Sequence, residues 1–316
     1  ARSDWPEVGA QMFFGCVVVV SLPLLVIVPF SAFRSLAGEW EDNTYELLSI
    51  SALKPHQIVS GKLGSSLLQM ALYLSAIAPC LAFTYLLRGI DLPTMFFLIF
   101  WLIINAISST LLALCLATLS RAKHWQVMMS VILIAGCLLN FASFGIGFSG
   151  ECLLSPYQML DFDEGEFWAA CGMLLTVALG YDAMFFLIAR AALLFNSENR
   201  STALRICMVV QYLLFMAWAF WGWLILFPEY EALAVFAIVI GIHWWVMGMF
   251  LIGERPELSQ RAKRRLPQSF VGRMFWITFN PGSGTGYLFV LGNLASAVIV
   301  LLLAPPLFSA MQPAIG

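Results

Sequence analysis

The stretch QMFFGCVVVVSLPLLVIVPFSAF, residues 11–33, contains no charged residue. A helix needs about 20 apolar residues to cross a hydrocarbon core of ~30 Å, so this run is long enough to span a membrane. Its apolar residues do not alternate strictly with polar ones, as the strands of a membrane barrel would require. The run therefore predicts a transmembrane helix, in which every backbone polar group is bonded within the segment.

Further apolar blocks of similar length follow along the 316 residues. Hydrophobic residues make up 61% of the chain and charged residues 11%, and the mean hydropathy of +0.88 is far above that of soluble domains. We predict an all-α, polytopic integral membrane helix bundle. The predicted spans are 11–33, 58–87, 94–119, 126–147, 167–190, 206–227, 232–252 and 287–308.

The basic residues between these spans are distributed very unequally. If the connection 34–57 faces the cytoplasm, fourteen Lys and Arg residues lie inside and only Arg88 lies in an outer loop, with Arg2 before the first span. Positive residues are retained on the cytoplasmic side, so this orientation is expected. The outer loops are acidic, with Asp91, Glu151, Asp161, Asp163, Glu164, Glu166, Glu229 and Glu231. A chain that enters its first span from outside also predicts a further span upstream.

A polar stretch, EDNTYELLSISALKPHQIVSGK at 41–62, separates the first two spans. Asn43 is a suitable helix N-cap, and Glu46 follows three residues later as in a capping box. Pro55 cannot continue a helix from Lys54 but is well placed to begin the next one. These signals predict a short cytoplasmic helix over 43–53, and the simplest interpretation is an ordinary loop helix.

The same stretch resembles the cytoplasmic loop of type-2 ATP-binding-cassette (ABC) exporter permeases. The sequence departs from that pattern at Trp40, Asn43 and Ala52, where the family favours Arg, Gly and Pro. The matching positions, in one register without a gap, are Glu39, Glu41, Thr44, Glu46, Leu47, Leu48, Leu53, Ile58, Gly61 and Lys62.

The resemblance implies the transmembrane subunit of an exporter or flippase in the cell (inner) membrane, and a cytoplasmic coupling helix at 43–53. This helix would bind a separate nucleotide-binding ATPase subunit that holds ATP and Mg, so the chain itself would need no cofactor. A homodimer or a paired permease and contact with membrane lipids are also implied, whereas no nucleic-acid partner is expected. The implied partner-binding residues are Glu39, Glu41, Thr44, Glu46, Leu47, Leu48 and Lys62.

Two regions are expected along the chain. Residues 1–190 form the permease-like membrane domain, and 191–316 add three spans with a basic cytoplasmic loop at 254–286. In that loop Arg261, Lys263, Arg264 and Arg265 would either face anionic lipid from a surface helix or only fix the topology. The added spans could serve dimerisation or partner docking.

Sequence motifs for catalysis or metal binding are missing from the chain. SGKLG at 60–64 lacks the spacing and the Ser or Thr of a P-loop, and GSGTG at 282–286 is interpreted as a flexible turn. The three histidines are far apart and show no metal-ligand spacing, and the seven cysteines suggest packing. We expect a transporter subunit, with no metal site, rather than an enzyme.

Polar residues inside spans are costly in lipid and usually face the interior of the bundle. Asp182 is the only acidic residue deep in a predicted span; it could contact substrate, but pairing with a neighbouring helix is the simpler interpretation. Interhelical hydrogen bonds are expected for five amides, of which Asn105 and Asn140 could also line a substrate path. These five are Gln69, Asn105, Asn140, Gln211 and Asn293.

Other interpretations stay open from sequence alone. A noncatalytic scaffold derived from such permeases is favoured by the three departures from the motif and by the added spans. An enzyme acting on lipid would need an acid, a base and a nucleophile brought together from distant positions. The outer loop at 149–168 could gate an exit path or simply be a solvated connection.

Overall fold

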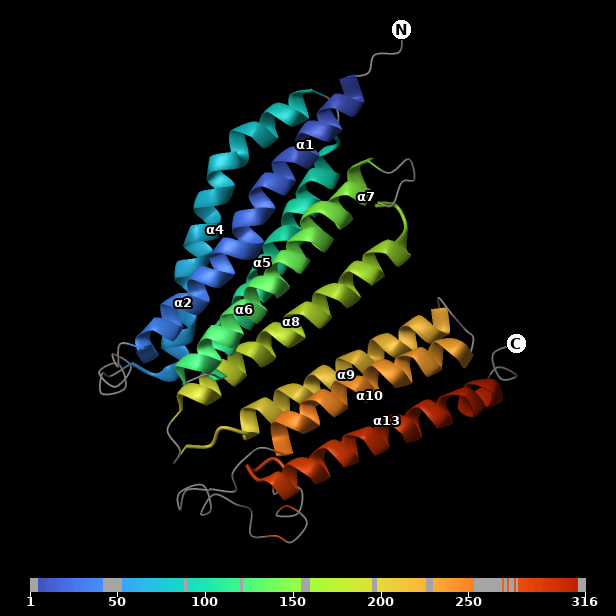
Figure 1. Ribbon diagram of the computed structural model, residues 1–316. Coiled ribbons are helices and arrows are strands. Elements are labelled where there is room, and N and C mark those ends of the chain that lie inside the picture. Colours follow the sequence, from blue (N-terminus) through green and yellow to red (C-terminus); the bar gives the residue numbers. More distant parts are fainter. Residues whose placement is uncertain are drawn as a thin grey trace. The chain divides into compact units, whose positions relative to one another are not determined.

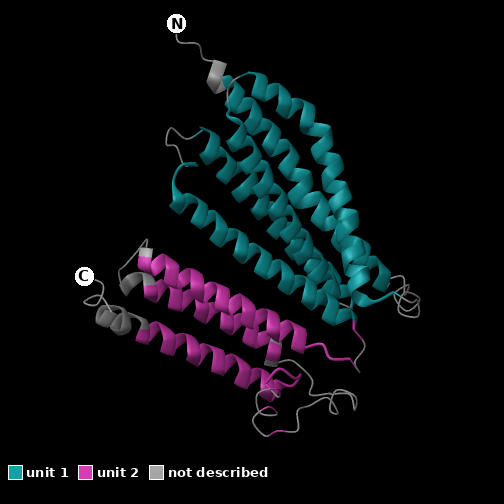
Figure 2. Cartoon of the chain, turned by 180° about the vertical axis from the view of Figure 1, so that it is seen from behind, with its two compact units in different colours: residues 1–193 teal, residues 194–316 magenta. Residues whose placement is uncertain are grey.

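The computed structural model is all-helical, and helices occupy all eight predicted positions (Figure 1). It describes residues 5–41, 53–87, 90–119, 122–154, 160–194, 198–225, 230–252, 278–311 and the single residues 269, 272 and 276. Two compact units divide the chain, residues 1–193 and 194–316 (Figure 2). In the described parts, seven helices are long and apolar enough to cross a membrane, and Leu233–Met249 is a shorter apolar helix. The protein is therefore a multi-pass helical membrane protein.

The first membrane helix of unit 1 is continuous but changes its winding in the middle. It consists of α1 (Trp5–Leu22), the π-helical turn η1 (Pro23–Ile27) and α2 (Val28–Glu41). In η1 the Val28 N–H is bonded to the carbonyl of Pro23, five residues back. Pro23 has no N–H to donate, and its ring crowds the preceding turn. Proline therefore explains why the regular α-helical hydrogen bonding is interrupted at this point.

Helix α4 (Pro55–Leu86) begins at Pro55, as the sequence predicts. Its first turn is closed by Gln57, whose side-chain oxygen accepts a hydrogen bond from the Lys54 N–H at 2.9 Å, in the manner of a capping residue. Pro79 lies within α4 without ending it. Helix α5 (Leu92–Leu119) follows and packs against α2 and along α8 (Gly165–Leu193).

The fourth membrane helix of unit 1 is longer than predicted. Helix α6 (Lys123–Asn140) continues through a second π-helix, η2 (Phe141–Phe148), into α7 (Ser149–Leu154). The residues after 147, expected as outer loop, thus begin as helix. π-Helical turns are rare, and those that occur are often found at functional sites. The side chains of η2 are therefore candidates for part of a functional site.

The core of unit 1 forms three apolar clusters. Phe13, Val17, Leu81 and Leu98 pack at the end that the charge distribution assigns to the outside. Leu24, Leu25, Met70 and Leu102 belong to the second cluster. The third lies at the end that the charge distribution assigns to the cytoplasm and includes Phe33, Leu36, Val59, Leu114 and Leu193. Many other large apolar side chains are exposed, as a lipid-facing surface requires.

Unit 2 contains α9 (Thr202–Ile225), α10 (Tyr230–Ile252) and α13 (Ser283–Met311), with α10 packed closely along α13. The run 282–286 is not the flexible turn expected from its glycines. Gly282 has φ 152°, a value that favours glycine, and α13 begins at the next residue. At Gly286 a Cβ atom would lie 2.8 Å from the Leu251 carbonyl oxygen, so glycine permits the close approach of α13 to α10.

Candidate functional site

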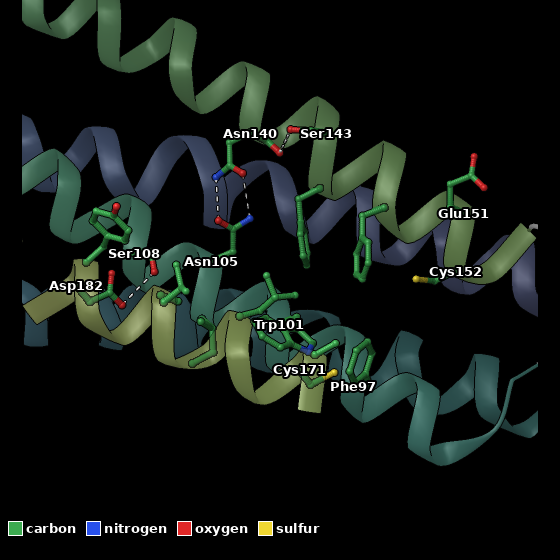
Figure 3. Close-up of a pocket in the computed structure, with 18 of the residues that line it drawn as sticks. Phe97, Trp101, Asn105, Ser108, Asn140, Ser143, Glu151, Cys152, Cys171 and Asp182 are labelled. Atoms are coloured by element: carbon green, nitrogen blue, oxygen red, sulfur yellow. Dashed lines mark hydrogen bonds between the residues drawn. The ribbon is translucent and has the colours of Figure 1, made fainter. Parts of the chain in front are cut away.

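A cavity of about 790 Å³ lies in unit 1, within the volume range of small-molecule sites. It is lined by α5, by α6 with η2 and α7, and by α8 (Figure 3). Figures 1 and 2 both show α8 diverging from η2 and α7 toward the connection that joins them. Along α8 the lining extends from Phe167, near the start of the helix, past Asp182 to Phe185.

The polar residues of the cavity form a network at its inner end. Asn105 and Asn140 exchange two hydrogen bonds, at 3.0 and 3.2 Å between the amide nitrogen of one and the oxygen of the other. The Asn140 amide also donates to the Ser109 hydroxyl at 2.9 Å. From the same helix α5, the Ser108 hydroxyl donates to Oδ2 of Asp182 on α8 at 3.0 Å. These bonds join α5 to α6 and to α8 (Figure 3).

Aromatic side chains supply most of the remaining wall. Phe144 and Phe148 stack on one side of η2, with ring centroids 5.2 Å apart. Phe97 and Trp101 line the cavity from α5, and Tyr181 from α8. Phe97 and Trp101 are four residues apart on α5, and Phe144 and Phe148 are four residues apart on η2. Each pair therefore lies on one side of its helix, and both pairs line the cavity.

Phe162, from the connection after α7, packs against two aromatic residues that line the cavity. Its ring lies 5.8 Å from that of Phe97 and 5.4 Å from that of Phe167. The Trp168 indole N–H holds the Phe162 carbonyl at 2.9 Å. This part of the connection is thus packed against the helices and is not simply solvated.

A smaller cavity of about 380 Å³ adjoins the first and is lined by Asp91, Asp161 and Asp163. Two of these carboxylates already serve local turns: Asp91 accepts from the Thr94 N–H at 3.3 Å, and Asp161 from the Asp163 N–H at 3.1 Å. Across the described residues there is no group of three or more His, Cys, Asp or Glu side chains placed to hold a metal ion.

The structure separates the predicted coupling residues into two groups. Glu39 and Lys62 come together, with 2.5 Å between Oε1 of Glu39 and Nζ of Lys62. The Lys62 ammonium also donates to the Ser35 carbonyl at 3.1 Å, so it ties the end of α2 to the first turns of α4. Glu41 is the last residue of α2. Thr44, Glu46, Leu47 and Leu48, with most of the predicted helix 43–53, lie outside the described residues.

The amides expected to join helices behave in three ways. Asn105, Asn140 and Gln69 do so, Gln69 by accepting a bond from the Ser31 hydroxyl at 3.0 Å. Asn293 donates to the Phe289 carbonyl of its own helix at 2.8 Å, and its interhelical role stays a prediction. Gln211 is buried, and its side chain has no hydrogen-bond partner in the described part of the chain.

Several residues of the site were not predicted from the sequence. Ser108 and Ser109 follow Asn105 at helical spacing in NAISST, residues 105–110, and this polar stripe in an apolar span was a usable signal. The aromatic wall carried no comparable signal, because aromatic residues occur throughout the spans. The basic residues Arg261, Lys263, Arg264 and Arg265 lie outside the described residues.

Comparison with known proteins adds no assignment. No protein-family model, no curated protein and no solved structure matches the chain. The ABC-permease resemblance at 39–62 therefore stays a prediction from the motif.

Proposed function

We propose that this protein is the transmembrane subunit of an ATP-driven exporter or flippase in the cell membrane. A separate nucleotide-binding subunit supplies ATP and Mg, and a second permease copy or a paired permease completes the transporter. The observation that carries the proposal is the ion pair between Glu39 and Lys62. It joins two positions of the motif on either side of the segment predicted to contact the ATPase.

The ion pair would make the two helices respond together. Any displacement of residues 43–53 acts on the ends of both α2 and α4, because the segment connects them and Lys62 holds them to one another. Helix α2 packs on α5, and α5 packs along α8, which brings the motion to the walls of the large cavity. Coupling through packed helices with two arrangements is an established way to transmit conformational change.

The cavity would be the substrate path. Its wall is mostly aromatic and aliphatic, with hydrogen-bonding groups gathered at the inner end, which suits an amphiphilic molecule. Export is the direction implied by the motif, and the cavity extends toward the acidic connections that the charge distribution assigns to the outside.

The test is affinity purification of the full-length protein from its native membrane, with assay of bound ATPase activity. We expect an ATPase to copurify, and replacement of Glu46, Leu47 and Leu48 together by alanine to reduce its recovery at least tenfold. Lys123→Ala is the matched control, because Lys123 is exposed at the start of α6 and lies outside the motif.

Absence of an ATPase in several detergents and in nanodiscs would overturn the proposal and favour the scaffold interpretation. Equal recovery with the triple variant and with Lys123→Ala would place the ATPase contact outside 43–53.

A further inference from the structure

The carboxylate of Asp182 is unusually placed for a charged group in a membrane helix. The residue is 7% exposed and lies at the inner end of the large cavity. Ser108 bonds its Oδ2 atom, while Oδ1 is buried and has no hydrogen-bond partner among the described residues. A carboxylate at this depth is costly unless a cation or further hydrogen bonds stabilise it.

The described lining of this cavity offers no such cation. It contains two acidic residues, Asp182 and Glu151, and no Lys, Arg or His. Glu151 is exposed, on α7 toward the outer end. In a low-dielectric surrounding the charge of Asp182 acts over several ångströms, so the inner end of the cavity favours a positive ligand group.

The rest of the wall suits the same kind of ligand. Phe144, Phe148, Trp101 and Tyr181 present ring systems to the cavity, and aromatic faces attract organic ammonium groups in addition to apolar chains. The volume of about 790 Å³ is sufficient for a small amphiphile.

We propose that this cavity binds a hydrophobic organic cation, an amphiphile that carries a protonated amine, with the ammonium group beside the Asp182 carboxylate. As a statement about transported substrate, this rests on the proposed function. As a statement about binding it does not, because binding needs neither ATP nor a partner subunit.

Equilibrium binding to the purified protein in phosphatidylcholine nanodiscs tests the proposal. The probe is dansylcadaverine, a fluorescent primary amine, and its N-acetyl derivative is the neutral counterpart. We expect the amine to bind about 10- to 100-fold more tightly than the acetylated compound. Asp182→Asn should remove that preference and leave the binding of the neutral compound unchanged. Glu164→Gln should preserve the preference, because Glu164 is exposed and lies outside the cavity lining.

Equal affinity of the native protein for both probes, or binding of neither, would overturn the proposal without any variant. Retention of the preference in Asp182→Asn would overturn the role of Asp182. If the protein binds the amine selectively but recruits no ATPase, only the proposed transport function is contradicted. If it recruits an ATPase but does not prefer the amine, only the proposed cation site is contradicted.

Discussion

The polar side chains of the cavity in unit 1 and the buried Arg205 of unit 2 are used in different ways. In unit 1, Asn105, Asn140 and Asp182 lie along the lengths of membrane helices and face a cavity. In unit 2 the fully buried Arg205 bonds backbone at the start of α13, donating to the carbonyls of Thr278 and Gly282. Its guanidinium also lies 5.7 Å from the centre of the Phe289 ring.

The difference indicates what each polar set does. A polar group that faces open space retains hydrogen-bonding capacity for another molecule, whereas one bonded to backbone carbonyls fixes a turn. Solute contact is therefore our proposal for the cavity of unit 1, whereas the bonds of Arg205 in unit 2 indicate a structural role. Three variants test this comparison.

The largest effect is expected from Arg205→Met. The change removes the guanidinium bonds to the carbonyls of Thr278 and Gly282 from a fully buried position and should lower the free energy of unfolding by about 2–5 kcal/mol. Thiol labelling localises the loss, because Cys207 is the only cysteine of unit 2. Cys207 should react faster while Cys115 and Cys137, buried in unit 1, stay protected. Arg205→Lys keeps the charge and should show a smaller loss; equal labelling of all three cysteines would contradict separate units.

A smaller effect is expected from Gly286→Ala, because the new Cβ would meet the Leu251 carbonyl. Overpacking of this kind costs about 1–3 kcal/mol, measurable as a shift in the denaturation midpoint. Gly284→Ala is the matched control two residues away, where a Cβ meets no atom within 4 Å. It should be neutral or slightly stabilising. If both variants behave alike, α13 does not pack on α10 through Gly286.

The smallest effect is expected from Asn140→Leu, which removes three interhelical hydrogen bonds of unit 1. Such bonds in membranes contribute about 0.6 kcal/mol on average and at most about 2, so the unfolding free energy should fall by roughly 1–2 kcal/mol. Asn293→Leu in unit 2 removes only a bond within one helix and should cost less. A larger loss from Asn293→Leu would reverse the comparison between the units.

Much of the helical architecture was accessible from sequence, because in a membrane the length of an apolar run determines a span. Pro55 marked the start of α4 for an equally local reason, since its fixed φ angle suits a first turn. The span predicted at 126–147 included most of η2, but its continuation into α7 was missed, because Ser149 and Gly150 are residues typical of a loop.

The site was predictable only in part. Asp182, Asn105 and Asn140 stood out because polar groups are rare in spans, and all three line the cavity. Their partners depend on how helices are rotated against one another, which no single-helix pattern specifies. The ion pair of Glu39 with Lys62 links residues 23 positions apart across a polar connection, and charge spacing alone did not indicate it.

The length of the large cavity along α8 is comparable with the thickness of a membrane. Phe167 and Asp182 both line it and are fifteen residues apart, which is about 22 Å at 1.5 Å per residue. That distance covers most of a hydrocarbon core of ~30 Å. A solute that moved along this cavity would therefore cross most of the hydrocarbon core inside the protein and not through lipid.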